Sequence, residues 1–344
     1  ELVREQYAEA RAVSEAESPG DRPEWASAPT RTKDEESFRV LAACGTLPEV
    51  ERAVELGMSG VGLYRTELMY LIDSGLPSVE VLSTHYAAVF DAASRCTEDE
   101  PVTFRLLDAD SGLRGASFHQ GREPNPELGC GGVRLLLSRE QLLRTQLRAM
   151  LSASRGAALR ILVPFVNDVS DLRRVRELLF EERFSLRKVG SPEEDRVELG
   201  AVIETPSAAL GASALAEEAD FLVLSLDGLS QYLLAADRQN LDLQHYFAPL
   251  HPIVLRTVEQ VADACRARGI QLSIYGPSMR DSANLPLLFG AGVREFLVSP
   301  ATLRAFRTLA ENVDVKVSRF AVRAARECAS QEELIEVVAR AAKP

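Results

Sequence analysis

The sequence predicts an α/β fold, a (β/α)8 barrel, on three observations. Eight short apolar runs recur along the chain, amphipathic segments separate them, and polar residues stand where several runs end. Continuous apolar runs that alternate with helices are typical of parallel strands buried on both faces. Eight such units are the number that closes a barrel. A doubly wound open sheet is the alternative that this alternation leaves open.

The eight apolar runs are the expected strands of the barrel. They occupy residues 39–44, 60–64, 102–107, 159–165, 199–203, 221–226, 271–275 and 294–299. Amphipathic patterns between them predict helices, among them 47–57, 171–184, 252–269 and 284–292.

The segments outside the repeats divide the chain further. Residues 1–16 are charged and Ala-rich and predict a helix, and residues 17–36 are rich in Pro, Ser and charge and predict a linker. The chain after Phe306 is expected to continue as helix to the C-terminus. We therefore expect a helix and linker over 1–36, a barrel over 37–310, and C-terminal helices packed on the barrel over 311–344.

Composition limits the function classes. The 344 residues are 46% hydrophobic and 26% charged, with a net charge of −12, which argues against nucleic-acid or acidic-membrane partners. No apolar stretch approaches the roughly 20 residues of a membrane span, and no signal peptide is visible. The five cysteines are scattered without C-x-x-C spacing, and the four histidines do not pair at metal-ligand spacing. We expect a cytoplasmic protein with reduced thiols.

Polar residues at the strand ends are the candidate site. A (β/α)8 barrel carries its chemistry at the C-terminal ends of its strands. Those residues are Arg65, Thr66, Glu67, Arg105, Asp108, Asn167, Glu204, Asp227 and Tyr275, with Arg238 in the sixth loop. One arginine is more often a salt-bridge partner than a ligand contact. Several arginines beside a carboxylate match phosphate or carboxylate oxygens, with a Glu available for a metal that neutralises a phosphate.

Two motifs at these ends have structural alternatives. Glu204 precedes Thr205-Pro206, which predicts a helix start, so a capping carboxylate is the alternative to a ligand. The segment "DADSG" (108–112) partly matches a calcium loop, but the later ligands are absent, and we interpret it as a turn.

Several ordered blocks carry a resemblance to one family. They include "GVGLYRTELMYL", "RLLDADSG", "NPELGCGGVRLLL", "GAVIETPSAAL", "ADFLVLSLDGLSQYLLAADRQN" and "GAGVREFLVSPATL". The chain resembles the C-terminal phosphoenolpyruvate-binding domain of enzyme I of the bacterial sugar phosphotransferase system, from its leading helix to about residue 330. Pyruvate phosphate dikinase and phosphoenolpyruvate synthase share this domain. The resemblance implies a (β/α)8 barrel, phosphoenolpyruvate bound with Mg²⁺, and a homodimer formed through this domain.

The resemblance also implies roles for individual residues. Arg65, Arg105 and Arg238 match substrate-binding arginines, and Glu204 matches a Mg²⁺ ligand.

Other positions depart from the family pattern. Gly131 stands where the family has a phosphate-binding arginine, and Gly228 stands where it has the second metal-ligand aspartate. Asp227 takes the place of an asparagine and is the candidate replacement ligand for the metal. Tyr275 replaces the cysteine that protonates the enolate carbon, and a phenol of pKa ~10 is a poorer acid near neutral pH than a thiol of ~8.5.

The family passes the phosphoryl group to a histidine on a separate N-terminal domain. None of the four histidines here lies in a matching motif, so that phospho-histidine domain would be a partner upstream of this sequence.

Three functions follow from these matches and departures. The first is an enzyme I-like barrel that has lost phosphotransfer and serves as a binding, dimerising or regulatory module, with weak affinity for phosphoenolpyruvate or another small anion. The second is an active phosphotransferase in which Asp227 and Tyr275 have taken over the metal and acid roles. The third is a Mg²⁺-dependent lyase or aldolase acting on an oxo acid. A further alternative for the site is that its arginines pair internally with Glu67, Asp108 and Glu204 and bind nothing.

Overall fold

The strands close into a single barrel. The computed structural model describes residue 25 and residues 29–71, 76–96, 100–109, 123–188, 196–248 and 251–341. All strand pairs are parallel, in the order of the chain, and β8 pairs with β1. The strands are β1 (Arg39–Cys44), β2 (Val61–Arg65), β3 (Val102–Arg105), β4 (Leu159–Val163), β5 (Val197–Ile203), β6 (Phe221–Ser225), β7 (Gln271–Tyr275) and β8 (Glu295–Val298). The predicted (β/α)8 barrel is confirmed, and the open sheet is excluded.

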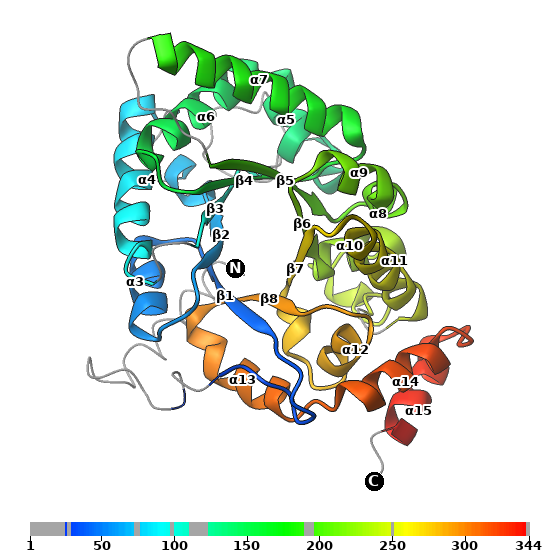
Figure 1. Ribbon diagram of the computed structural model, residues 1–344. Helices are drawn as coiled ribbons and strands as arrows, with labels where there is room; N and C mark the ends of the chain where they lie inside the picture. The colour runs from blue at the N-terminus through cyan, green and yellow to red at the C-terminus, as the bar shows by residue number, and fades with distance from the viewer. Residues whose placement is uncertain are drawn as a thin grey trace.

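Helices surround this barrel as an outer ring (Figure 1). They are α3 (Leu47–Glu55), α4 (Val79–Ala93), α5 (Gly132–Ser138), α6 (Glu140–Ser154), α7 (Val169–Lys188), α8 (Pro206–Leu210), α9 (Ala212–Glu218), α10 (Leu226–Leu234), α11 (Pro252–Arg268), α12 (Asn284–Gly290) and α13 (Leu303–Glu311). Short 3-10 turns are η1 (Glu67–Tyr70), η2 (Pro126–Leu128), η3 (Leu241–Leu243), η4 (Pro277–Arg280) and η5 (Pro300–Thr302). Two more helices, α14 (Val315–Ala325) and α15 (Gln331–Ala341), extend beyond the ring.

Local sequence signals set several of these helix boundaries. Thr46 and Glu49 form a capping box at the start of α3, in which each satisfies a backbone N–H of the other. Gly269, with φ of 68°, ends α11 in the left-handed conformation that favours glycine. Asp314 accepts a hydrogen bond from Val317 N and starts α14. The region after Phe306 is helical, as expected, and such caps divide it into three separate helices.

The core has two layers that share the strands. Inside the barrel, a small cluster of Leu, Val and Phe side chains fills the lumen, and Tyr275 packs against it. Outside, a larger apolar cluster lies between the strands and the helices. Gly200 on β5 is needed inside, because a Cβ there would lie 2.6 Å from the ring of Phe221.

Two strands end two residues earlier than their apolar runs. The run at 159–165 predicts a strand to Phe165, but β4 ends at Val163 and Phe165 adopts a φ of 57°. This turn directs the Phe165 N–H toward a carboxylate at the neighbouring strand end. Leu106 and Leu107 are buried but lie beyond β3, which ends at Arg105. The apolar runs reflect burial, and burial continues past the strand ends.

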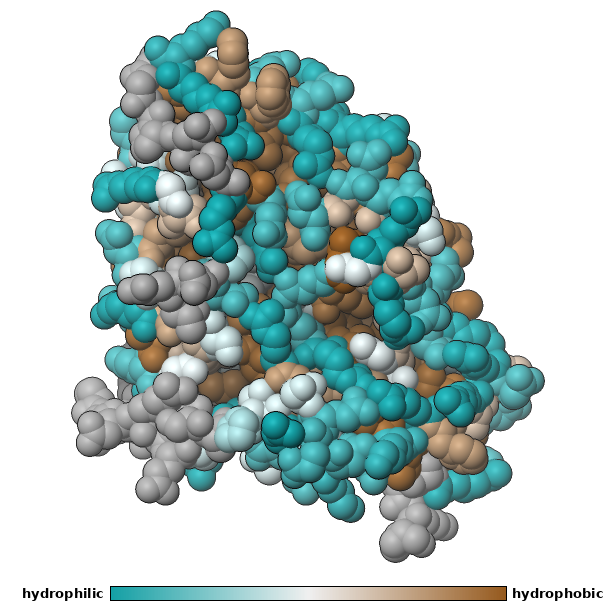
Figure 2. Space-filling model, in the orientation of Figure 1, coloured by the Kyte–Doolittle hydropathy of each residue, from teal (hydrophilic) through white to brown (hydrophobic). Residues whose placement is uncertain are grey.

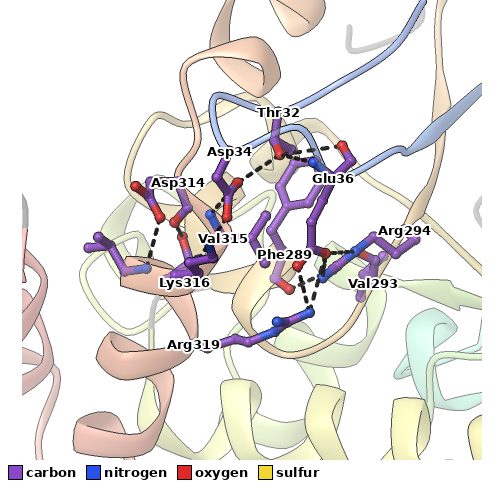
Figure 3. A network of polar contacts seen from close by, with 12 residues as sticks. Thr32, Asp34, Glu36, Phe289, Val293, Arg294, Asp314, Val315, Lys316 and Arg319 are labelled. Carbon is purple, nitrogen blue, oxygen red and sulfur yellow. Dashed lines mark hydrogen bonds and ion pairs between the residues drawn. The ribbon is translucent and has the colours of Figure 1, made fainter.

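The segment before β1 is fastened to the C-terminal region (Figure 3). Asp34 accepts hydrogen bonds from the backbone N–H groups of Val315 and Lys316, at the start of α14. Glu36 forms ion pairs with Arg294 and Arg319, at 2.7 and 2.9 Å. We call this group of contacts the clip. It joins the segment before β1 to Arg294 and α14 at the N-terminal end of the barrel.

Most of the expected upstream segment, 1–24 and 26–28, lies outside the described residues, as do residues 110–112 of "DADSG". The division of the chain at residues 36 and 310 stays a prediction.

The face shown in Figure 2 carries mainly hydrophilic side chains, with hydrophobic ones between them. Phe180 and Phe184 on α7 are among the exposed ones, at 69% and 52%. Across the described part of the chain, no helix has both the length and the apolarity needed to span a membrane.

Candidate functional site

The candidate residues meet at one end of the barrel, which we call the barrel mouth. Arg65, Arg105 and Tyr275 are the last residues of β2, β3 and β7, and Glu204 directly follows β5. Because all strands are parallel, these positions share one end of the barrel. Asp227 follows β6, at the second position of α10.

Arg105 is buried and held by several partners. Its guanidinium donates to Glu67 Oε1 at 3.1 Å and to the Tyr275 hydroxyl at 3.3 Å, and it lies 3.0 Å from Asp108 Oδ2. Burial opposes its charge, but the carboxylates of Glu67 and Asp108 outweigh burial and raise the pKa of Arg105. Its Nε is buried without a hydrogen-bond partner within the described residues. For Arg105, the internal pairing that we weighed as an alternative is present.

Glu204 lies at the base of the mouth. Its Oε1 accepts a hydrogen bond from Phe165 N at 2.8 Å, which explains the left-handed turn after β4. Burial, with a contribution from the Asp108 carboxylate, raises the pKa of Glu204 to about 7. The positive charges of Arg105 and Arg238 act in the opposite direction. Glu204 is therefore a carboxylate that exchanges its proton near neutral pH.

Asp227 points away from Glu204, toward η4. Its carboxylate accepts hydrogen bonds from Ser278 Oγ at 2.5 Å and from Ser278 N at 3.2 Å. Burial nevertheless raises the pKa of Asp227. Asp227 thus stabilises the turn after β7 through its hydrogen bonds to Ser278. Ser278 is a residue that we did not single out from the sequence.

A side chain at position 228, unlike that of Asp227, would point toward Glu204. A Cβ at Gly228 would lie 3.0 Å from Glu204 Oε2 and 2.8 Å from Ser225 Oγ. A side chain at this position would therefore project directly at the Glu204 carboxylate. The one-residue shift from 228 to 227 turns a carboxylate from Glu204 to Ser278.

Tyr275 combines a buried ring with a hydroxyl at the mouth. Burial raises the pKa of Tyr275 to about 12, and the nearby Arg105 charge only partly offsets that. The phenol is therefore neutral at physiological pH and bonded to the Arg105 guanidinium.

Arg65 and Arg238 differ from Arg105. Within the described residues, neither guanidinium makes a hydrogen bond or an ion pair with a protein group. Arg65 is half-buried beside Gly45, where a Cβ would lie 3.3 Å from its Nη2. Arg238 is exposed, and its charge lowers the pKa of both Glu204 and Asp227, so it faces the mouth. The mouth therefore has two cationic groups that the described residues leave unpaired.

Gln146 is a second residue that sequence reasoning missed. It is a fully buried glutamine on α6 that contacts the ends of β2 and β3 from outside the barrel. The sequence signal that could have identified Gln146 was a polar residue on the apolar face of the helical segment "EQLLRTQLRAML" (140–151).

Comparison with known proteins decides the family. Residues 21–315 match the family described as "PEP-utilising enzyme, PEP-binding domain". The chain belongs to this family. The resemblance to enzyme I is thereby confirmed, and the chain corresponds to the PEP-binding domain of an enzyme I-like phosphotransferase.

Individual members of the PEP-utilising family give the extent of the match. The chain is 34% identical over 340 residues to the phosphoenolpyruvate-protein phosphotransferase of Lactococcus lactis subsp. lactis (strain IL1403), covering 97% of this chain and 58% of the relative. It is 33% identical over 339 residues to the same-named protein of Streptococcus equinus, with the same coverage of 97% and 58%. It is 33% identical over 307 residues to the same-named protein of Staphylococcus carnosus (strain TM300), covering 89% of this chain and 53% of the relative. The chain thus spans a little over half the length of these relatives.

Proposed function

We propose that this PEP-binding-type barrel binds a small anion, phosphoenolpyruvate or a simpler phosphate or carboxylate, and does not carry out phosphotransfer. The single observation that carries the proposal concerns Arg65 and Arg238 in a protein of net charge −12: among the residues that the structure describes, neither guanidinium has a protein partner. Arginine side chains that lack internal carboxylate partners match the oxygens of a small anion.

The metal chemistry of the family is poorly supported by the residues present. Mg²⁺ is usually held by one or two carboxylates together with substrate oxygens and water. Glu204 supplies one carboxylate, while Asp227 is hydrogen-bonded to Ser278 and Gly228 supplies none. Within the described residues, no group of three Asp, Glu, His or Cys side chains is arranged to hold a metal. The set does not fit a strong Mg²⁺ site, and we assign no step to the metal.

The acid chemistry is equally weak. A phenol with a pKa of about 12 gives up its proton far less readily near neutral pH than a thiol of ordinary pKa ~8.5. Tyr275 therefore serves better as a neutral hydrogen-bond partner of Arg105 than as a proton donor to carbon.

The test is calorimetric titration of the chain with phosphoenolpyruvate, inorganic phosphate, oxalate and pyruvate, each with and without Mg²⁺. We expect weak, metal-independent binding of phosphate or phosphoenolpyruvate. Arg65→Gln and Arg238→Gln should each weaken it about tenfold, as expected for the loss of a charge-assisted contact. Arg323→Gln, an exposed arginine on α14, is the matched control. The absence of any binding would refute the proposal.

Other outcomes of the same titration would select the remaining functions. Mg²⁺-dependent binding of phosphoenolpyruvate, with pyruvate release when a family histidine domain is supplied, would establish an active phosphotransferase. Mg²⁺-dependent preference for pyruvate or oxalate would favour the oxo-acid lyase.

The setting of the domain is also proposed by family. We expect a homodimer formed through this domain and, in an active relative, a phospho-histidine domain as its partner. Free cysteines are consistent with a reducing compartment, which supports a cytoplasmic location.

A further inference from the structure

The strands that carry Arg65 and Arg105 are only briefly paired with each other. β2 and β3 pair at Tyr64 with Phe104 and at Arg65 with Arg105. By contrast, β4 and β5 are paired at five successive positions. Beyond Arg65 and Arg105 the two strands no longer pair with each other, although Leu106 N still donates to Leu162 O of β4 at 2.9 Å. These segments nevertheless carry the Glu67 and Asp108 side chains of the mouth. Side chains must therefore hold these two segments to each other, in place of backbone pairing between them.

Gln146 supplies that connection from behind the barrel. Its Oε1 accepts a hydrogen bond from Leu107 N at 3.0 Å, and its Nε2 donates to Thr66 Oγ1 at 2.9 Å. Nε2 also donates to the Tyr86 hydroxyl at 3.3 Å. One buried amide thus binds the residue after β2 and a residue just beyond β3.

Thr66 completes the link between the two strand ends. Its hydroxyl donates to the Arg105 carbonyl at 3.0 Å while it accepts from Gln146. On the mouth side, Glu67 Oε1 accepts from both Asp108 N and the Arg105 guanidinium. The backbone from 105 to 108 is consequently bonded on both sides, by Gln146 and Thr66 behind it and by Glu67 in front.

We propose that Gln146 is a positioning residue of the anion site, which fixes Arg65 and Arg105 relative to each other through the ends of β2 and β3. The inference rests on the proposed function, because a positioning residue needs a ligand to position for. Gln146 touches no ligand itself. Without its amide, Leu107 N would be a buried donor with no partner, and the 105–108 backbone would move to satisfy it. A shift of that backbone carries the Arg105 guanidinium and its Glu67 partner with it.

The first experiment compares ligand binding by three variants of the full chain. Inorganic phosphate and phosphoenolpyruvate are titrated into Gln146→Leu, which keeps volume but removes both hydrogen-bonding groups. Leu143→Ala is the control, a buried residue of the same helix that is apolar. We expect at least tenfold weaker binding for Q146L and less than a twofold change for L143A, although L143A loses stability by leaving a cavity. Equal effects of the two variants would reduce Gln146 to a packing residue and overturn the proposal.

The third variant, Gln146→Glu, gives a signature that packing cannot mimic. A protonated carboxyl group has one O–H donor and one carbonyl acceptor, so it reproduces the amide bonds to Thr66 and Leu107. Its ionised form has no donor. We expect Q146E to bind within threefold of the wild type at pH 5 and at least tenfold more weakly at pH 8, each compared with the wild type at the same pH. If the ratio of the Q146E affinity to the wild-type affinity does not change between pH 5 and pH 8, the result would contradict the proposal.

A second measurement separates failure of this inference from failure of the proposed function. Amide hydrogen exchange over residues 102–109, measured without ligand, should be faster in Q146L and unchanged in L143A. If the wild type binds neither anion, the proposed function is wrong, and the exchange data still decide whether Gln146 holds the strand ends. Unchanged exchange in Q146L would overturn the inference whatever the titrations show.

Discussion

Individual side chains at the barrel mouth are set by the direction of the backbone that carries them. Asp227 and Gly228 are adjacent in the chain, yet a side chain at 227 reaches Ser278 and one at 228 would reach Glu204. The departure from the family at these two positions is therefore a change of geometry as well as of composition.

Gly228→Asp should create a second carboxylate against Glu204. A Cβ at 228 would crowd Glu204 Oε2 and Ser225 Oγ, which are side-chain ends that can shift. It would also lie 3.2 Å from Glu204 Cβ, which must give way slightly. We expect Mn²⁺ affinity, measured by electron paramagnetic resonance, to rise about tenfold or more over the wild type. Gly228→Asn, of the same shape without the charge, is the control. Equal Mn²⁺ binding by the two variants would show that no two-carboxylate site had formed.

Glu204 should make stability depend on pH between about 4.5 and 7. Its pKa is raised to about 7 in the folded chain from an ordinary 4.5, so the folded state holds the proton more tightly. Its ionisation therefore costs the folded state stability as pH rises through this window, by about 1–3 kcal/mol. Urea unfolding of Glu204→Gln should lack this decline and show higher stability than the wild type at pH 8. Parallel pH profiles for the two proteins would contradict the assignment.

At the scale of elements, the clip connects the segment before β1 to α14. Asp34 adds a second carboxylate to a helix start that already has Asp314 as its cap. Burial is the largest single effect and raises the pKa of Asp34, but the hydrogen bonds to this helix terminus and to Thr32 together outweigh it and lower the pKa. A lowered pKa means that the stabilisation is present above the ordinary carboxyl pKa and is lost as pH falls through the folded value.

Asp34→Ala should destabilise the chain by about 1–2 kcal/mol at pH 7, the range for loss of a helix cap. The increase in amide hydrogen exchange over the wild type should be largest in the first turn of α14, near Val315. Lys316→Ala, which keeps the backbone N–H and removes only an exposed side chain, is the control. A loss of stability in D34A without faster exchange at Val315 would place its effect elsewhere.

The elements were largely predictable from the sequence. The pairing of Arg105 with Glu67 and Asp108 was among the alternatives that the sequence offered, but the other contacts within the site were not predictable. The eight apolar runs identify the strands because burial on both faces leaves a continuous apolar signal. Phe165 ends β4 early because its N–H bonds Glu204, a residue 39 positions away. Gln146 bonds Thr66 across 80 positions. Such pairings depend on barrel register, which local patterns do not encode.

At the scale of the whole molecule, the family match predicts a dimer, and the described surface does not mark its interface. The exposed Phe180 and Phe184 lie four residues apart on α7 and share one face of that helix, where charged side chains flank them. We expect light scattering at micromolar concentration to give twice the mass of 37.7 kDa. A constant mass of one chain across a dilution series would refute the dimer.

The clip has a consequence for anything attached upstream of it. It anchors the chain at the N-terminal end of the barrel, whereas Arg65 and Arg238 lie at the mouth. The seven residues of β5 alone rise by about 20 Å, at ~3.3 Å each. A histidine module tethered before residue 29 would have to travel around the outside of the barrel to meet a ligand there. The length of its tether would then set the local concentration of the acceptor, and a tether shorter than this detour would give an effective concentration near zero.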